Sequence, residues 1–244
     1  MVSDRITAST ATKGSEEILR NIFRWEGRVV YYVVTDRFND GDKTNNDGID
    51  LNDREKFHGG DWQGVIDKLD YIKGLGVDCI WLSCPYLNDR DFFGKDGFHG
   101  YWPHDFYKTE PHFGSMDKLR ELTEKAHEKG IKIMLDVVVN HTGYNHPFVN
   151  DPDHGDWYHE KGDIKGYSEY HMVNRSLAGL PDLAHENPKV GRYLIDVHKW
   201  WVEQSGIDAF RVDAARHVPE EFLRKFNEEL HDSKENLLIV IPYR

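Results

Sequence analysis

The sequence predicts an α/β fold built on a parallel sheet. Five short runs rich in Val, Ile and other apolar residues alternate with segments whose apolar residues recur every three or four positions. This alternation of strands and helices is typical of parallel sheets with right-handed crossovers. Eight such units close a (β/α)8 TIM barrel, and this chain offers about five, so we predict a partial barrel.

The first two strands flank the first helix. Residues 29–35 are β-branched and aromatic, which predicts a strand, and 1–28 before it form a polar segment with a short helix predicted at 16–25. A helix is predicted at 61–75, because apolar residues recur there at helical spacing and glycines follow. The apolar run 77–83 is the second predicted strand.

The third unit begins with a long connection. Residues 84–114 are rich in glycine and aromatic residues and predict a loop. Ser115 is a good helix cap and Gly130 a good helix end, so a helix is predicted between them. The run 131–139 is almost entirely apolar, as a strand covered on both faces requires.

The last two units follow the longest excursion of the chain. Residues 140–187 are rich in Gly, His and Asp, and connections of this length are usually functional. A helix is predicted at 188–205, followed by a fourth strand that ends at Asp213. Pro219 opens another predicted helix, and 237–241 is the fifth strand.

Composition excludes several classes of function. The net charge of −12 argues against nucleic acid as a partner, because phosphates need clusters of Lys and Arg. No apolar run approaches the roughly 20 residues of a membrane span, and no basic amphipathic helix suggests a membrane surface. The start of the chain lacks the apolar core of a signal peptide, which leaves the compartment open. Cys79 and Cys84 are expected to be unpaired core thiols.

The segment 206–217 carries the strongest chemical signal. On a strand, Ile207, Ala209, Arg211 and Asp213 share one face. Burying an arginine and an aspartate is costly unless they pair or do chemistry. Arg211 could keep the Asp213 carboxylate ionised, as a nucleophile needs, or the two could form a purely structural pair inside a barrel.

Four segments resemble motifs of one enzyme family, in its order. They are 206–217, Asp136–His141, Gly100–Pro103 and Leu180–Leu183, and they resemble the α-amylase family of glycoside hydrolases. The chain is most similar in these motifs to calcium-dependent amylases, neopullulanases, cyclomaltodextrinases and cyclodextrin glycosyltransferases. The resemblance implies an N-terminal portion of a TIM barrel with a small inserted domain after the third strand. Its predicted parts are 1–28 (N-terminal segment), 29–139 (barrel units), 140–188 (inserted domain) and 189–244 (further barrel units).

The resemblance also implies roles for individual residues. Asp213 would be the nucleophile of a retaining glycosidase, with Arg211 orienting it. His141 would hydrogen-bond the sugar at the point of cleavage, and Tyr101 would stack beneath it. Arg216 and His217 would lie toward the leaving group. Trp102 is a further candidate for substrate binding, although we favour a core position for its ring.

Two calcium sites are expected on the same grounds. The loop after the first predicted strand crowds carboxylate and amide oxygens, which Ca²⁺ prefers, although a solvated turn uses the same residues. By resemblance its ligands are the side chains of Asp40, Asn45, Asn46 and Asp61 and the backbone oxygens of Asp42 and Gly59. A second site would join Asn140, Asp182 and the backbone oxygen of His217.

One expected residue is missing from its place. The family carries its general acid as a glutamate after the fifth strand, where this chain reads Ile241-Pro242. We therefore expect a truncated relative with negligible turnover alone, whose parent acts on α-1,4-glucans such as starch, maltooligosaccharides or cyclodextrins. The alternatives are a non-catalytic carbohydrate-binding relic and, for the parent, glycosyl transfer. Open barrel edges also predict self-association.

Overall fold

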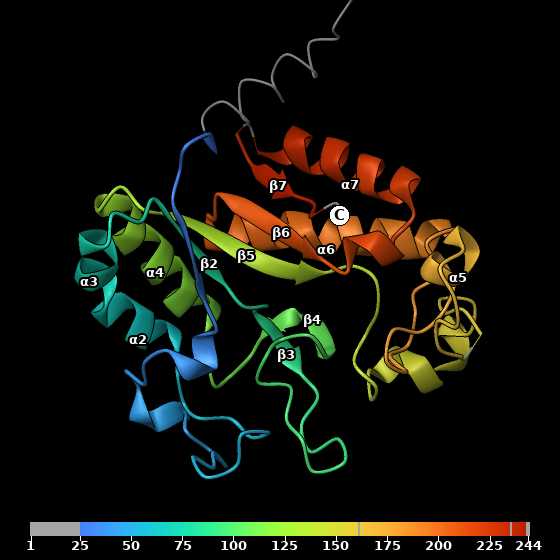
Figure 1. Ribbon diagram of the computed structural model, residues 1–244, viewed down its shortest axis with the longest axis horizontal. Coiled ribbons are helices and arrows are strands. Elements are labelled where there is room, and N and C mark those ends of the chain that lie inside the picture. The colour runs from blue at the N-terminus through green and yellow to red at the C-terminus, as the bar shows by residue number, and fades with distance from the viewer. Residues whose placement is uncertain (1–24, 161, 235, 243–244) are drawn as a thin grey trace, which may run out of the picture.

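The sheet is parallel and its strands follow one another in chain order. The computed structural model describes residues 25–160, 162–234 and 236–242. Within them a five-stranded sheet has the order β1-β2-β5-β6-β7 (Figure 1). Its strands are β1 (Val30–Val33), β2 (Cys79–Leu82), β5 (Lys132–Val138), β6 (Ala209–Asp213) and β7 (Leu238–Val240). The predicted α/β fold with a parallel sheet is confirmed.

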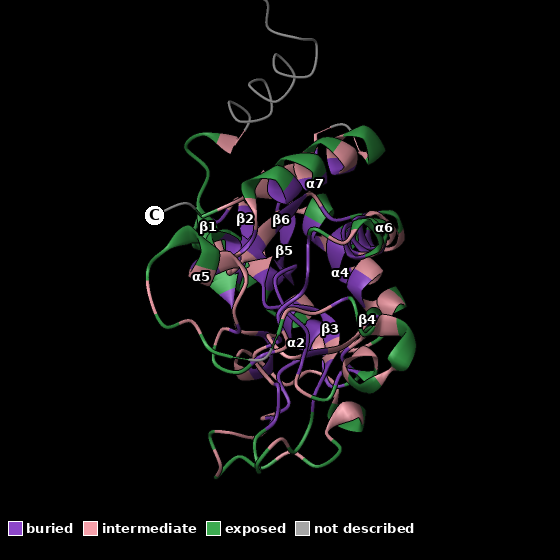
Figure 2. Cartoon of the chain, turned by 90° about the vertical axis from the view of Figure 1, so that its right-hand side faces the viewer, coloured by how far each residue is buried: buried purple, intermediate pink, exposed green. Residues whose placement is uncertain are grey.

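Helices connect the strands and cover one face of the sheet. Figure 2 shows α4, α6 and α7 on the same side of the strands. The helices are α2 (Trp62–Asp67), α3 (Leu69–Gly74), α4 (Met116–Glu128), α5 (Glu169–Val173), α6 (Pro188–Ser205) and α7 (Glu220–Ser233), with short 3-10 turns η1 (Thr35–Arg37), η2 (Lys43–Asn45), η3 (Pro147–Asn150), η4 (Pro152–His154) and η5 (Ala215–His217). No helix among these residues is long and apolar enough to cross a membrane.

The prediction of a single helix at 61–75 is wrong. This segment forms two helices, α2 and α3, which meet at Lys68, where the backbone leaves the helical region. Val65 and Leu69 lie on either side of the break and both are buried. The apolar spacing therefore continues across the break, and periodicity alone could not reveal it.

The predicted loop at 84–114 is also wrong in part. It contains an antiparallel pair, β3 (Tyr86–Asn88) and β4 (Pro103–Thr109), with irregular register. Tyr86 and Phe106 are fully buried and their rings meet edge to face at 5.1 Å. The contacts that hold this pair join residues far apart in the sequence. The sequence of neither strand shows the alternation of apolar and polar residues by which a strand is predicted.

The core has two unequal parts. The large part lies between the sheet and its helices and includes the buried rings of Trp62, Trp201 and Phe210. On the opposite face, Cys79, Met134 and Ala209 form a small cluster. Cys79 and Cys84 are buried and unpaired as predicted, and burial raises the pKa of the Cys79 thiol to about 12.

The excursion between β5 and α6 is mostly irregular and is tied back at its base. Isolated bridges join His141 to Asp182 and Tyr158 to Leu183. The helix predicted at 16–25 lies outside the described residues apart from its last position. Self-association through sheet edges stays a prediction, although Val30 and Tyr32 of β1 are partly exposed.

Gly64 allows the loop after β1 to lie against α2, and its replacement is expected to destabilise the protein. A Cβ added to Gly64 would meet the backbone oxygen of Asn39 at 1.7 Å. We expect Gly64→Ala to lower the free energy of unfolding by about 1–3 kcal/mol, as overpacking does. Gly74 ends α3 with nothing within 4 Å of its added Cβ. Gly74→Ala is the matched control in urea unfolding, and an equal effect of both variants would contradict this contact.

Candidate functional site

Three charged side chains meet on the face of the sheet away from the helices. The register pairs Asp136 with Arg211 and Val138 with Asp213, so β5 and β6 bring both carboxylates to one guanidinium. Arg211 Nη1 lies 2.6 Å from Asp213 Oδ1 and 3.1 Å from Asp136 Oδ1. Asp213 ends its strand with part of its side chain exposed, whereas Asp136 is fully buried. The predicted pair is therefore a triad with two carboxylates.

Burial and ion pairing oppose one another at this triad. Desolvation raises the pKa of Asp136 to about 6, even though Arg211 and the hydroxyl of Tyr101 favour its charged form. Burial acts to lower the pKa of Arg211, but the two carboxylates outweigh it and raise that pKa. Arg211 therefore stays charged, as a residue that orients an ionised Asp213 must.

Tyr101 joins this triad through its hydroxyl. Its O–H donates to Asp136 Oδ2 at 2.9 Å and lies 3.5 Å from the hydroxyl of Tyr32. The ring of Trp81 packs on Tyr32 at 4.3 Å and beneath the guanidinium of Arg211 at 5.1 Å. Aromatic side chains from β1, β2 and the loop before β4 thus pack around the charged groups.

His141 is buried beside Tyr101. Its Nε2–H donates to the backbone oxygen of Tyr101 at 3.1 Å, and its Nδ1 accepts from the side-chain amide of Asn140 at 3.3 Å. Desolvation lowers the pKa of His141 to about 4, so the ring is neutral near pH 7. In this arrangement His141 positions Tyr101, and its predicted hydrogen bond to a sugar stays a prediction.

The remaining predicted binding residues lie around the same end of the sheet. Arg216 is exposed and lines a hollow of about 560 Å³ beside Met172. His217 Nδ1 lies 2.9 Å from the backbone oxygen of Met172, which links η5 to α5. Trp102 is only partly buried and packs in a surface group of aromatic rings. The core position favoured for Trp102 is therefore wrong.

The loop after β1 gathers oxygen atoms that lack partners. The side-chain oxygens Oδ1 of Asp40, Asn45 and Asn46 are buried without a hydrogen bond. A Cβ on Gly59 would meet Asn46 Oδ1 at 2.6 Å, so only a glycine backbone fits this close to those oxygens. Three unsatisfied buried oxygens within one short loop suit a hard cation.

The carboxylates of two other residues predicted to bind calcium accept hydrogen bonds within the protein. Asp61 caps α2 and accepts from the backbone N–H groups of Gly41 and Asp42 at 3.2 and 2.8 Å. The Asp42 carboxylate accepts from Thr44, which leaves its backbone oxygen as the predicted ligand. Among the residues that the structure describes, no three His, Cys, Asp or Glu side chains are grouped to hold a metal. A cation here would depend on the Asp40 carboxylate together with amide and backbone oxygens.

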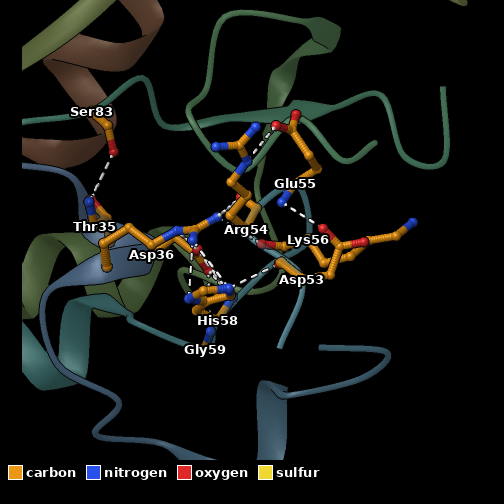
Figure 3. A network of polar contacts seen from close by, with 10 residues as sticks. Thr35, Asp36, Asp53, Arg54, Glu55, Lys56, His58, Gly59 and Ser83 are labelled. Carbon is orange, nitrogen blue, oxygen red and sulfur yellow. Dashed lines mark hydrogen bonds and ion pairs between the residues drawn. The ribbon is translucent and has the colours of Figure 1, made fainter. Parts of the chain in front are cut away.

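A buried carboxylate anchors the same loop to the turn η1, which follows β1. Asp36 accepts from the backbone N–H groups of His58 and Gly59 at 2.8 and 3.1 Å, as Figure 3 shows. Arg37 pairs with Asp36 at 2.7 Å and donates to the backbone oxygens of Arg54 and Lys56. These contacts hold the segment around Gly59 next to Asp40 and Asn46.

The second predicted calcium site contains one buried oxygen atom that has no hydrogen-bond partner. Asn140 Oδ1 is buried without a partner. Asp182 pairs with His159 at 2.7 Å, and burial raises the pKa of the Asp182 carboxyl. Asn140 and Asp182 approach across the backbone bridge at His141, and the ring of His217 is held to the Met172 backbone oxygen in α5. A cation at this set stays a prediction.

Comparison with known proteins decides the family. The family model of the alpha amylase catalytic domain matches residues 32–239. The chain belongs to the alpha-amylase family. It is similar to a beta/alpha-amylase of Paenibacillus polymyxa, with 42% identity over 217 residues, 84% of this chain and 18% of that protein. It is also similar to a cyclomaltodextrin glucanotransferase of Klebsiella oxytoca, with 34% identity over 85% of this chain and 36% of that protein.

Solved structures of alpha-amylase family members share the fold. An Anoxybacillus alpha-amylase has a TM-score of 0.86 and 46% identity over 89% of this chain and 47% of its own. An alpha-amylase from Geobacillus thermoleovorans, solved with acarbose, has a TM-score of 0.83 and 40% identity over 89% of this chain and 46% of its own. The chain thus spans just under half of these structures and a smaller share of the curated relatives.

Sequence reasoning missed part of this alpha-amylase family site. Asp136 was read only as the start of a motif, although a carboxylate within the apolar run 131–139 was a signal of a buried ion pair. Tyr32 and Trp81 gave no signal, because aromatic residues in a strand are usually core. Their contacts with Tyr101 and Arg211 depend on how the strands align.

Proposed function

We propose that this chain forms the nucleophile-bearing part of a retaining glycoside hydrolase that acts on α-glucans. The observation that supports it is Asp213 at the carboxyl end of β6, partly exposed and held by Arg211 at 2.6 Å. The active sites of parallel barrels lie at that end of the strands. The family's relatives include amylases and cyclodextrin-forming enzymes, which favours α-1,4-linked glucose polymers as the substrate class.

Each residue of the site has a part in this reaction. An Asp213 carboxylate oxygen attacks the anomeric carbon of the sugar, the bond to the leaving oxygen breaks, and a glycosyl ester forms that water then hydrolyses. Arg211 orients the attacking oxygen and places a positive charge beside it. Tyr101, fixed by Asp136 and His141, presents its ring as a platform for the sugar.

The leaving oxygen needs a proton from a second carboxyl group about 5.5 Å from the nucleophile. β7 places Val240 level with Arg211, and the next residues are Ile241 and Pro242. We propose that these 244 residues alone react slowly with glycosides whose leaving group must be protonated. General-acid assistance is worth about 10²- to 10⁴-fold. Substrates with a leaving group that needs no proton test the function directly.

Two other functions differ in their expected result. A non-catalytic carbohydrate-binding protein would bind maltoheptaose without forming an ester on Asp213. Glycosyl transfer would form the same ester and pass the sugar to an acceptor hydroxyl in place of water. Mass spectrometry of the chain after reaction with 5-fluoro-α-glucosyl fluoride decides between ester formation and binding alone.

We propose that the loop after β1 binds Ca²⁺. Asp40, Asn45 and Asn46 would supply side-chain oxygens, and Asp42 and Gly59 backbone oxygens, with Asp61 ordering the loop from α2. The ion would supply the positive charge that these unsatisfied oxygens lack and so join the loop to the barrel wall. The set around Asn140, Asp182 and His217 is a second proposed site, beside the nucleophile.

Calcium is therefore expected to stabilise the protein. At a Ca²⁺ concentration of 100 times Kd, stabilisation should reach about 2.7 kcal/mol, and a chelator should remove it. Asn46→Ala should reduce the calcium-dependent rise in Tm, because its orphaned oxygen is lost. Asn52→Ala, in the same loop and exposed, is the control. Equal melting curves with calcium and with chelator would rule out both sites.

A further inference from the structure

Trp81 lies against the guanidinium of Arg211, and no step of the proposed reaction involves it. The strand register places Trp81 of β2 level with Met134 of β5, and Met134 level with Ala209 of β6. Arg211 follows two residues after Ala209, so its side chain points to the same face of the sheet. The centre of the Trp81 ring is 5.1 Å from the guanidinium carbon of Arg211. The ring therefore reaches across β5 to a side chain of β6.

Hydrogen bonds fix only one end of the Arg211 guanidinium. Its Nη1 lies 2.6 Å from Asp213 Oδ1 and 3.1 and 3.3 Å from the two carboxylate oxygens of Asp136. In the described part of the chain, neither its Nη2 nor its Nε donates a hydrogen bond. A bidentate pair would define the plane of a guanidinium, whereas contacts through one nitrogen do not. A second restraint is needed to keep Nη1 directed at Asp213.

Trp81 can supply this restraint through the face of its ring. Its Nε1–H group is buried and, among the described residues, has no hydrogen-bond partner. A buried donor without a partner costs free energy, and phenylalanine or leucine would fill the space without that cost. Tryptophan, however, offers a cation the most favourable aromatic face of any side chain. The contact with Arg211 is therefore a physical reason for a tryptophan at this position.

The Trp81 ring is itself held in place by its neighbours. Tyr32 is level with Trp81 in the register of β1 and β2, and the two ring centres are 4.3 Å apart at an angle of 43°. Trp81 also packs against the small cluster of Cys79, Met134 and Ala209. A ring restrained by these contacts can restrain the guanidinium in turn.

We propose that Trp81 is a positioning residue whose ring keeps Nη1 of Arg211 directed at the carboxylate of Asp213. This inference rests on the proposed function and adds to it a residue on which the rate of attack by Asp213 depends. Trp81 acts through Arg211 and not by contact with the sugar. Its loss therefore slows formation of the glycosyl ester and leaves sugar binding unchanged. An aromatic residue that only filled space would affect stability and not the rate.

The test measures fluoride release from α-maltotriosyl fluoride. Trp81→Leu should lower kcat about 2- to 30-fold, which is the range expected for loss of a cation–π contact, with KM unchanged. Trp81→Phe keeps an aromatic face and should recover part of the lost rate. Trp200→Leu makes the same change at a partly buried tryptophan on α6. It is the matched control and should change neither kcat nor KM.

A double-mutant cycle shows whether Trp81 acts through Arg211. Arg211→Lys keeps the charge but removes the planar guanidinium. In that background Trp81→Leu should lower kcat by less than about twofold further, because the group that the ring positions is already lost. Equal fold losses in the two backgrounds, or a rise in KM with kcat unchanged, would contradict the proposal.

Two further outcomes separate this inference from folding and from the proposed function. If Trp81→Leu does not fold by circular dichroism, Trp81→Met takes its place, because methionine also fills the site without an aromatic face. An unchanged kcat in the folded variant, with Asp213 still labelled by 5-fluoro-α-glucosyl fluoride in the wild-type chain, would overturn the role of Trp81 alone. No labelling of Asp213 in the wild-type chain would overturn the proposed function and this inference with it.

Discussion

Asp213→Asn is expected to reduce fluoride release from α-maltotriosyl fluoride to the uncatalysed background. Fluoride leaves with its electron pair and needs no proton, so reaction of this substrate does not depend on a general acid. Wild-type chain should release fluoride and should accumulate an ester on Asp213 when the 5-fluoro analogue is used. Asparagine cannot supply the attacking carboxylate oxygen, and the mass increase on the peptide that carries residue 213 should disappear.

The controls separate loss of chemistry from loss of structure. Asp196→Asn changes a half-exposed carboxylate on α6 and should leave fluoride release unchanged. If the proposed lack of a general acid is right, the wild-type chain should hydrolyse starch more slowly than it reacts with the fluoride, because only the leaving oxygen of starch needs a proton. Fluoride release that persists in a folded Asp213→Asn protein would remove Asp213 from the role of nucleophile.

Arg211→Met is expected to have the largest effect on stability. It leaves the buried carboxylate of Asp136 without its cation, and breaking a buried pair in this way typically costs about 3–5 kcal/mol. The variant should therefore unfold at much lower urea concentration at pH 8. Arg192→Met, which removes a half-exposed pair with Glu229 and Asp196, should cost less than about 1 kcal/mol.

The pH dependence of stability should identify Asp136 as the cause of the destabilisation in Arg211→Met. The pKa of Asp136 is about 6 in the folded protein, above its ordinary value of 3.8, so the folded state binds more protons than the unfolded state between these two values. The contribution of Asp136 to the free energy of unfolding is therefore fully present below about pH 4 and is lost as the pH rises to about 6. Without Arg211 the folded pKa should rise further, so the stability of Arg211→Met should keep falling above pH 6. A destabilisation that is constant from pH 5 to pH 8 would contradict this assignment.

Local chemistry accounts for much of what could be predicted from the sequence. Residues 131–139 and 207–213 form strands because their apolar, β-branched side chains suit a covered sheet. Side-chain alternation placed Arg211 and Asp213 on one face, and Ser115 and Gly206 mark helix ends through capping and a left-handed φ. The carboxylate and amide oxygens after β1 were evident as a cluster for the same reason: they lie close together in the chain.

Contacts between distant segments were decided only by the tertiary structure. The strand register of β5 and β6 brings Asp136 to Arg211 across 75 positions, and the loop before β4 brings Tyr101 onto the same carboxylate. The stacked rings of Phe92 and Tyr144 are brought together in the same way. Secondary-structure periodicity reports which face a side chain occupies, because that depends on the local backbone. It carries no information on which strand lies alongside, because that depends on burial and pairing summed over the whole fold.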